Sequence, residues 1–194
     1  MRLLVLLGLC LPTAAPAQTI WVSNEESNLL HLIDGKTLKE RARIEIGSGP
    51  RGIVLSPDGT KVYVAVSRDN RIAEVDVATG RILGHIPSGP DPETFAISPD
   101  GKRLFAANED DNLLSFVDVA AKKITSEVLV GGEPEGTAVS PDGKLVIQTS
   151  ESASMAHVVD SATGEVIDNL LVDTRPRYAA FTPDGRRFWI SSEV

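Results

Sequence analysis

Cysteine is almost absent from the sequence: the single copy, Cys10, lies in an N-terminal apolar stretch. This stretch, residues 3–11, is shorter than the roughly 20 residues that a membrane-spanning helix needs. The small residues at 15–17 match the pattern that signal peptidases recognise. We therefore expect residues 1–17 to be a signal peptide that is cleaved after Ala17. The cleaved chain would contain no thiol, which excludes disulfides, cysteine nucleophiles, attached c-type haem and cysteine-based metal sites.

An alternative role for Cys10 is lipid attachment, as in exported lipoproteins. The preceding residue, Leu9, disfavours this interpretation because a small residue is expected at that position. The sequence has no second apolar stretch of the length that a membrane helix requires. We therefore expect an exported protein that does not insert into the membrane after its signal peptide is removed.

Runs of basic residues are lacking as well. The chain of 194 residues carries a formal net charge of −8, with 27 acidic residues against 19 lysines and arginines. An acidic surface repels nucleic-acid phosphates and anionic lipids, so nucleic acid is not expected as a partner. Aromatic residues make up only 5% of the chain, while 16 glycines and 12 prolines indicate many turns. The length suits one globular domain.

A short turn sequence, Ser/Thr-Pro-Asp-Gly, is what the chain has in abundance. Its four copies begin at positions 56, 98, 140 and 182, so each step is 42 residues. Equal steps without insertions are typical of stacked structural repeats. Two further columns keep the same spacing: the aspartates Asp34, Asp76, Asp118 and Asp160, and the prolines Pro50, Pro92, Pro134 and Pro176.

Each repeat unit has the pattern of four short β-strands. In the unit that begins at Pro50, strand-like segments at 52–55, 61–66, 72–77 and 81–86 are separated by turns rich in Gly, Pro and Asp. Four antiparallel strands in about 40 residues describe one blade of a β-propeller. A β-sandwich is the alternative, but sandwich strands need not repeat in phase. We therefore predict an all-β propeller of four-stranded antiparallel blades.

The phase of the repeat predicts the domain organisation. About four blades fit into a partial β-propeller over 18–194. The first unit lacks an inner strand and the last unit stops after its second strand, so we expect a propeller that is truncated at the C-terminus. A closed ring of four blades is the alternative. The expected units are a three-stranded incomplete blade at 20–49, complete blades at 50–91, 92–133 and 134–175, and a two-stranded incomplete blade at 176–194.

Charged residues vary between the repeats at two positions near the top of each blade. One position follows the repeated proline, and the other follows the second strand; both should ring one mouth of the propeller channel. Such a ring could hold a cation, a polar ligand or a basic partner, or it could form ion pairs between blades. The repeated aspartates are instead expected to cap turns. The predicted binding residues are Arg51, Glu93, Glu109, Glu135, Glu151 and Arg177.

Recognisable catalytic and metal-binding motifs are missing. The chain has no His-Glu-x-x-His motif, no Gly-x-Ser-x-Gly motif and no Gly-Lys-Ser/Thr phosphate loop. His31 and His157 occupy the same column of the repeat and would be the pair to consider for a metal. They lie three units apart, so we expect ordinary strand histidines and no metal site. We also expect no catalytic residue and no cofactor of the chain's own.

The second strand of each unit follows a four-residue pattern, with a polar loop and then Ile/Val-Asp after it. Copies are WVSN at 21–24, YVAV at 63–66 and FAAN at 105–108. Over 20–194 the chain resembles the YVTN-type β-propeller repeat family. Within that family the chain is similar to the branch associated with pyrroloquinoline quinone (PQQ)-dependent alcohol catabolism. This narrower resemblance is carried by segments 88–93, 107–111, 132–136, 149–151, 155–157 and 175–181.

The resemblance implies a setting for the protein. Members of this branch are periplasmic propellers of seven repeats, so the chain would form part of a seven-bladed ring and would end about three blades early. The branch occurs beside quinoprotein dehydrogenases, c-type cytochromes and a transport system, and any of these could be a partner. PQQ itself is expected in the associated dehydrogenases and not in this chain.

These observations predict a non-catalytic binding or scaffold protein that binds a ligand or a protein through its channel mouth. The first alternative is a lactonase-like hydrolase that uses the acidic residues of the mouth. The second is a purely structural scaffold without a specific site, since propellers serve many functions.

Overall fold

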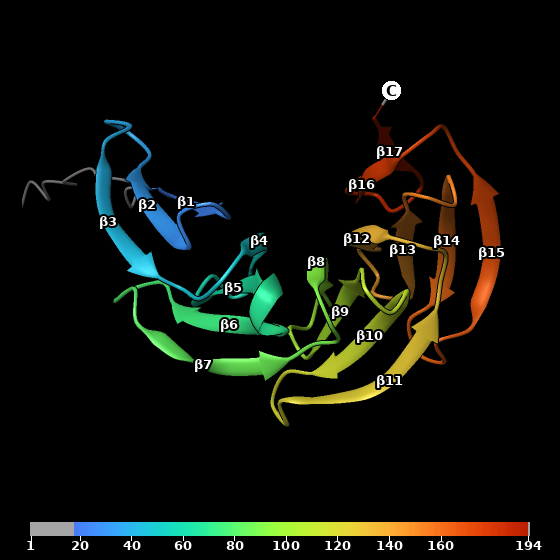
Figure 1. Cartoon of the computed structure of the whole chain (residues 1–194), viewed down its shortest axis with the longest axis horizontal. Helices are drawn as coiled ribbons and strands as arrows, with labels where there is room; N and C mark the ends of the chain where they lie inside the picture. Colours follow the sequence, from blue (N-terminus) through green and yellow to red (C-terminus); the bar gives the residue numbers. More distant parts are fainter. Residues whose placement is uncertain (1–17, 194) are drawn as a thin grey trace, which may run out of the picture.

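The computed structural model describes residues 18–193, which form five antiparallel sheets arranged along an arc (Figure 1). The expected signal peptide and Cys10 lie outside these residues. The predicted all-β propeller of four-stranded blades is confirmed. The one helical element within 18–193 is a single 3₁₀ turn at Ser67–Asp69. In this part of the chain no helix has the length and apolar character that crossing a membrane requires.

Each sheet is one blade, and consecutive strands are neighbours within it. Blade one consists of β1 (Thr19–Asn24), β2 (Leu29–Asp34) and β3 (Glu40–Glu45), and blade five of β16 (Pro176–Phe181) and β17 (Phe188–Ser192). Blades two, three and four have all four strands. Blade two consists of β4 (Pro50–Leu55), β5 (Lys61–Val66), β6 (Arg71–Asp76) and β7 (Ile82–Pro87), and blade three of β8 (Pro92–Ile97), β9 (Arg103–Asn108), β10 (Leu113–Asp118) and β11 (Lys123–Leu129). Blade four consists of β12 (Pro134–Val139), β13 (Leu145–Ser150), β14 (Met155–Asp160) and β15 (Val166–Leu171).

The repeated turns are held by their aspartates, as predicted. Asp58 Oδ1 accepts hydrogen bonds from the Ser56 hydroxyl (2.6 Å) and the Thr60 backbone N–H (3.0 Å), which lowers the pKa of Asp58 to about 2. Gly59 has a φ of 71°, a conformation that side-chain-bearing residues avoid. Asp160 caps its own turn by accepting the backbone N–H groups two and three residues further on (2.9 and 2.8 Å).

The hydrophobic core lies between the faces of neighbouring blades. Phe105 of blade three is fully buried and packs edge-to-face on Phe116, with ring centroids 5.1 Å apart. Val146 and Val159 of blade four cover this pair from the other side. Comparable clusters fill the other three interfaces between consecutive blades. The alternation of apolar residues along each strand therefore supplies both faces of every complete blade.

The arc does not close. Blades one and five lie at its opposite ends (Figure 1), so the alternative of a closed four-bladed ring is not what forms. Within residues 18–193, β1 pairs only with β2, and β17 pairs only with β16. Trp189 of β17 is 65% exposed beside this open edge. Open strand edges with exposed apolar residues promote pairing with other chains.

Candidate functional site

Two of the predicted mouth residues, Glu109 and Glu151, directly follow the second strands β9 and β13. The other four lie at the start of the first, inner strand of a blade, where bulges free their side chains from the sheet: Arg51, Glu93, Glu135 and Arg177. In blade four, β12 pairs with β13 at Pro134 and then again only from Thr137. Glu135 and Gly136 therefore lie in an irregular stretch, and the Gly136 N–H donates to the Thr149 hydroxyl instead (2.7 Å). The same interruption follows the repeated proline in blades two and three, and an interruption that is one residue shorter follows it in blade five. Such bulges reorient side chains at the edge of a sheet.

One half of the site consists of glutamates that contact Arg177 of β16. Its Nη1 contacts both Glu135 and Glu151, the latter at 2.5 Å, and its Nε donates to Glu193 at 3.0 Å. Arg175 contacts the other oxygen of Glu151 at 2.8 Å. This half therefore joins blades four and five through two arginines and three glutamates.

The other half consists of glutamates that contact Arg51 of β4. This arginine contacts Glu93 of blade three directly and lies 3.7 Å from Glu109 and 3.4 Å from Glu25 of blade one. Arg68 adds a second cation at 3.3 Å from Glu25. The structure thus places all six predicted residues at the same mouth, distributed over two groups of ion pairs that link neighbouring blades.

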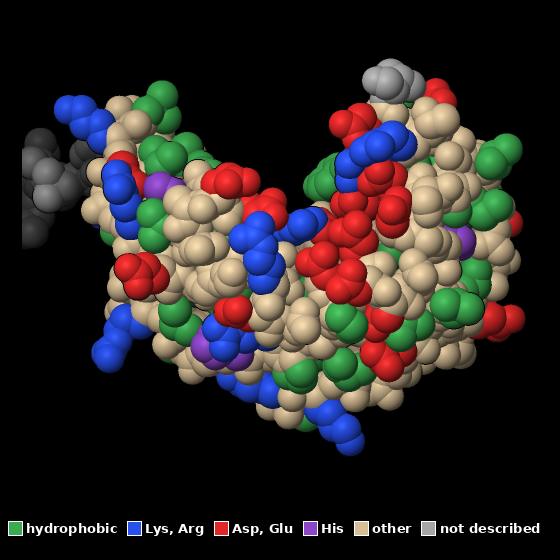
Figure 2. Space-filling view, in the orientation of Figure 1, with side chains coloured by type: hydrophobic (Ala, Val, Ile, Leu, Met, Phe, Trp, Pro, Cys, Tyr) green, Lys and Arg blue, Asp and Glu red, His purple; other side chains and the backbone are tan. Residues whose placement is uncertain are grey.

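Acidic side chains fill the space between the two arginine groups. Figure 2 shows them as a continuous red patch in the hollow of the arc, with blue side chains on both sides. We refer to the whole set as the mouth cluster, in which seven carboxylates face four guanidinium groups. Its members are Glu25, Arg51, Arg68, Asp91, Glu93, Glu109, Glu135, Glu151, Arg175, Arg177 and Glu193.

Burial makes this excess of negative charge costly. Glu93, Glu135 and Glu151 are only 5%, 7% and 9% exposed. Burial raises the pKa of Glu135 to about 7 against the opposing effect of Arg177, and the neighbouring carboxylates of Glu151 and Glu109 raise it further. The pKa of Glu109 is also raised, first by burial and then by the charge of Asp91. The mouth cluster thus holds more negative charge than its arginines neutralise.

A group of three carboxylates at the mouth includes one residue that the sequence reasoning missed. Oxygens of Asp91, Glu93 and Glu109 lie within 4.8 Å of one another, which is close enough for one cation to contact all three. Asp91 precedes the repeated proline of blade three, whereas Gly49 and Arg175 stand at the matching positions of blades two and five. Extending the variable columns by one position toward the N-terminus would have found both Asp91 and Arg175.

A serine, a histidine and an asparagine meet inside blade four. His157 Nε2 accepts hydrogen bonds from the Ser150 hydroxyl (3.0 Å) and the Gly131 N–H (2.9 Å), and its Nδ1 lies 2.5 Å from the Asn169 Oδ1. The order of groups is that of a nucleophile, a base and an orienting residue. Ser150 has no exposed surface, however, so a substrate cannot reach its hydroxyl. The arrangement satisfies buried polar groups and ties three strands together.

His31 has separate partners in blade one. Its Nδ1 lies 2.6 Å from Glu40, which also binds Arg43 at 2.7 Å. The contacts of His31 and His157 therefore belong to two different blades, one and four.

Comparisons with known proteins agree with this architecture. A family model described as YNCE-like beta-propeller matches residues 22–139. Hydrazine synthase of Kuenenia stuttgartiensis has a TM-score of 0.80 and 24% identity, over 87% of this chain and 50% of that chain. A functionally unknown protein of Desulfotomaculum acetoxidans DSM 771 has a TM-score of 0.79 and 16% identity, over 90% and 59%. No curated protein sequence matches the chain.

The chain thus spans between half and three fifths of the length of these two solved structures. At such low identities the likeness shows the fold alone.

Proposed function

Because the chain belongs to the YNCE-like β-propeller family, we propose that it is a non-catalytic binding or scaffold protein that takes a ligand or a protein partner through the mouth cluster. The observation that carries this proposal is the set of three buried glutamates, Glu93, Glu135 and Glu151, in a cluster with more carboxylates than guanidinium groups. Retaining such charges at a surface hollow costs folding free energy. A positively charged partner would offset that cost, so a basic ligand or protein surface fits the site best.

The proposal extends to the cellular setting. The signal-peptide pattern of residues 1–17 supports export, and the resemblance of the repeats supports a place in the periplasm beside PQQ-dependent alcohol oxidation. The partner would then be a quinoprotein dehydrogenase, a c-type cytochrome or a transport component. In each case PQQ would belong to the dehydrogenase, and the propeller would contribute a docking surface.

The test is binding of purified candidate partners to the immobilised chain. We expect one of the three to bind, and we expect affinity to fall as salt is raised because the contact is electrostatic. Glu109→Gln should weaken binding at least threefold, since it removes one half-exposed carboxylate of the mouth cluster. The matched control is Glu165→Gln, which removes an exposed carboxylate from a turn of blade four. Equal binding by both variants would contradict a mouth interface.

The second candidate is a hydrolase such as a lactonase. The specific observation in its favour is the group of Asp91, Glu93 and Glu109, whose oxygens could hold a divalent cation that polarises a carbonyl. A panel of lactones with added Ca²⁺ or Mn²⁺ tests it. Turnover that disappears in Glu93→Gln would favour the enzyme, and no turnover with any lactone would remove this candidate.

A further inference from the structure

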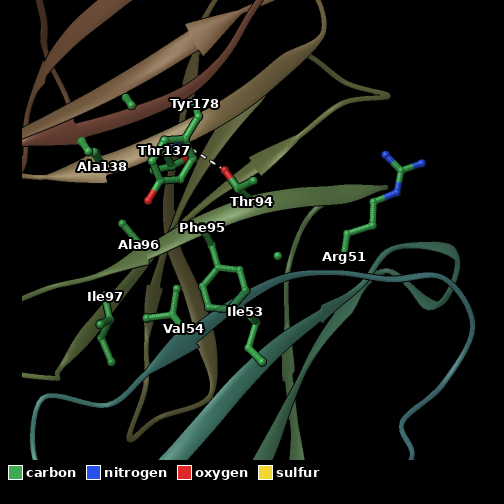
Figure 3. A pocket seen from close by; sticks show the side chains of 13 residues that line it. Arg51, Ile53, Val54, Thr94, Phe95, Ala96, Ile97, Thr137, Ala138 and Tyr178 are labelled. Carbon is green, nitrogen blue, oxygen red and sulfur yellow. Dashed lines mark hydrogen bonds between the residues drawn. The ribbon is translucent and has the colours of Figure 1, made fainter. Parts of the chain in front are cut away.

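A groove of about 440 Å³ runs along the inner strands and reaches Arg51 of the mouth cluster. Strands β4, β8, β12 and β16 form its wall, because each packs against the next along the arc. Figure 3 shows that side chains of several inner strands converge on this space, with Arg51 at one end. Small-molecule pockets commonly have volumes of about 300–1,000 Å³. The apolar side chains that line the groove include Ile53, Val54, Phe95, Ile97, Ala138 and Ala180.

The two threonine hydroxyls of the groove already have partners within the protein, whereas the hydroxyl of the exposed Tyr178 is available to a ligand. The Thr94 hydroxyl donates to the backbone carbonyl of Glu135 and accepts the Thr137 N–H at 3.0 Å. The Thr137 hydroxyl donates to Gln148 at 2.7 Å. The wall therefore presents an apolar surface to an incoming molecule, and it offers few free hydrogen-bonding groups.

The end of the groove at the mouth cluster is charged, whereas its wall is apolar. Thr94 lies one residue after Glu93 and bonds to the backbone of Glu135, so the groove begins where these two glutamates are held. The mouth cluster around them has seven carboxylates and four guanidinium groups. Arg51 is the charged side chain that lines this end of the groove, and it is paired there with Glu25, Glu93 and Glu109. A molecule in the groove would thus meet apolar side chains along its body and, around Arg51, the excess carboxylates of the mouth cluster at one end.

We propose that this groove binds an organic cation in which a compact apolar body carries one ammonium group. The inference rests on the proposed role of the mouth cluster as a binding site and names the ligand that the adjoining groove would take. The ammonium group lies among the carboxylates of the mouth, and the apolar body lies along β8 and β12. A carboxylate ligand of the same shape is repelled by the mouth, and a neutral one loses the charge contact.

A matched set of three ligands tests the proposal: 1-naphthylmethylamine, 1-naphthalenemethanol and 1-naphthoate. They share one ring system and differ in the charge of a single substituent. Titration of the full chain by calorimetry and ligand-observed NMR at pH 7.5 should show binding of the amine, at least tenfold weaker binding of the alcohol, and no binding of the acid. Equal affinities for all three, or no binding of the amine, would overturn the proposal.

Substitutions in the groove test whether the amine binds there. Ala180→Phe fills the groove and should weaken amine binding at least tenfold, whereas Ile167→Phe, a change at a half-exposed site on β15, should leave it unchanged. Ile97→Thr serves as a second groove variant, expected to weaken binding about threefold, should Ala180→Phe fail to fold in a thermal melt. Amine binding that neither groove variant weakens would contradict the groove as its site.

The result can be separated from the test of the proposed function. If a protein partner binds through the mouth but the amine does not bind, only the present inference fails. If the amine binds and every candidate partner fails to bind, the inference stands and the docking role fails.

Discussion

Replacing Arg177 by methionine should destabilise the fold, and the loss should grow with pH. Within residues 18–193 the guanidinium group of Arg177 is the only cation in contact with Glu135, and it also contacts Glu151 and Glu193. Methionine keeps much of the length of the side chain but removes its charge and donors. Glu151 retains Arg175 at 2.8 Å, whereas Glu135 keeps no cation at hydrogen-bonding distance from the described part of the chain.

The magnitude follows from the protonation of Glu135. Burial places the pKa of this carboxyl at about 7, so at pH 6 the group is mostly protonated with or without Arg177. The loss there is limited to weakened hydrogen bonds, about 1 kcal/mol. Without the guanidinium the pKa rises, and each pH unit above 7 adds about 1.4 kcal/mol until the group ionises in the variant. We therefore expect a loss of about 2–3 kcal/mol at pH 8.

Urea unfolding of both proteins at pH 6 and pH 8 measures this difference. The matched control is Arg43→Met, because Arg43 is 62% exposed and pairs with Glu40, whose pKa is lowered to about 2. Glu40 is ionised at both pH values, so the control should show only a small loss of stability at each, because an exposed ion pair is screened by solvent. A loss for Arg177→Met that is independent of pH, or no larger than that of the control, would refute the reasoning.

Three further predictions concern stability. A carboxyl whose folded pKa of about 7 exceeds its ordinary 4.5 binds its proton more tightly in the folded state, so stability should fall as pH rises through this range. Glu135→Gln should flatten that fall in urea unfolding; an unchanged slope would contradict it. Phe105→Ala should cost about 3–5 kcal/mol in the same assay, against less than about 0.5 for the exposed Leu171→Ala. Gly59→Ala should cost about 1 kcal/mol through its positive φ alone, since no atom lies within 4 Å of the added methyl group; a stabilised variant would contradict this.

The fold could be predicted because the repeat is local and regular. Each turn aspartate marks the position of the hairpin turn that it caps. Asp58 and its equivalents therefore locate the flanking strands without knowledge of the tertiary structure. Four strands per 42 residues then leave few architectures open. Closure of the ring is different, because it depends on curvature accumulated over several interfaces. The repeat alone therefore allowed a closed ring of four blades, whereas the structure is an open arc.

The candidate site could be predicted only as two columns of residues. Columns identified Glu135 and Arg177 because the residue after each proline varies in charge, and the structure brings this pair together. Pairings between columns, such as Arg51 with Glu109, depend on side-chain reach across blades and are not visible in the spacing. Nor does the sequence reveal burial, which distinguishes Glu93 from an ordinary surface glutamate.

The central claim is that the mouth cluster is one site, in which the carboxylates outnumber the guanidinium groups and affect one another's protonation. The most direct measurement is a pH titration of the glutamate side-chain carboxyl carbons by NMR on selectively labelled protein. We predict one carboxyl with an apparent pKa near 7 that disappears in Glu135→Gln and moves upward in Arg177→Met. Titration of every glutamate between about 4 and 5, close to the ordinary value, would contradict the account.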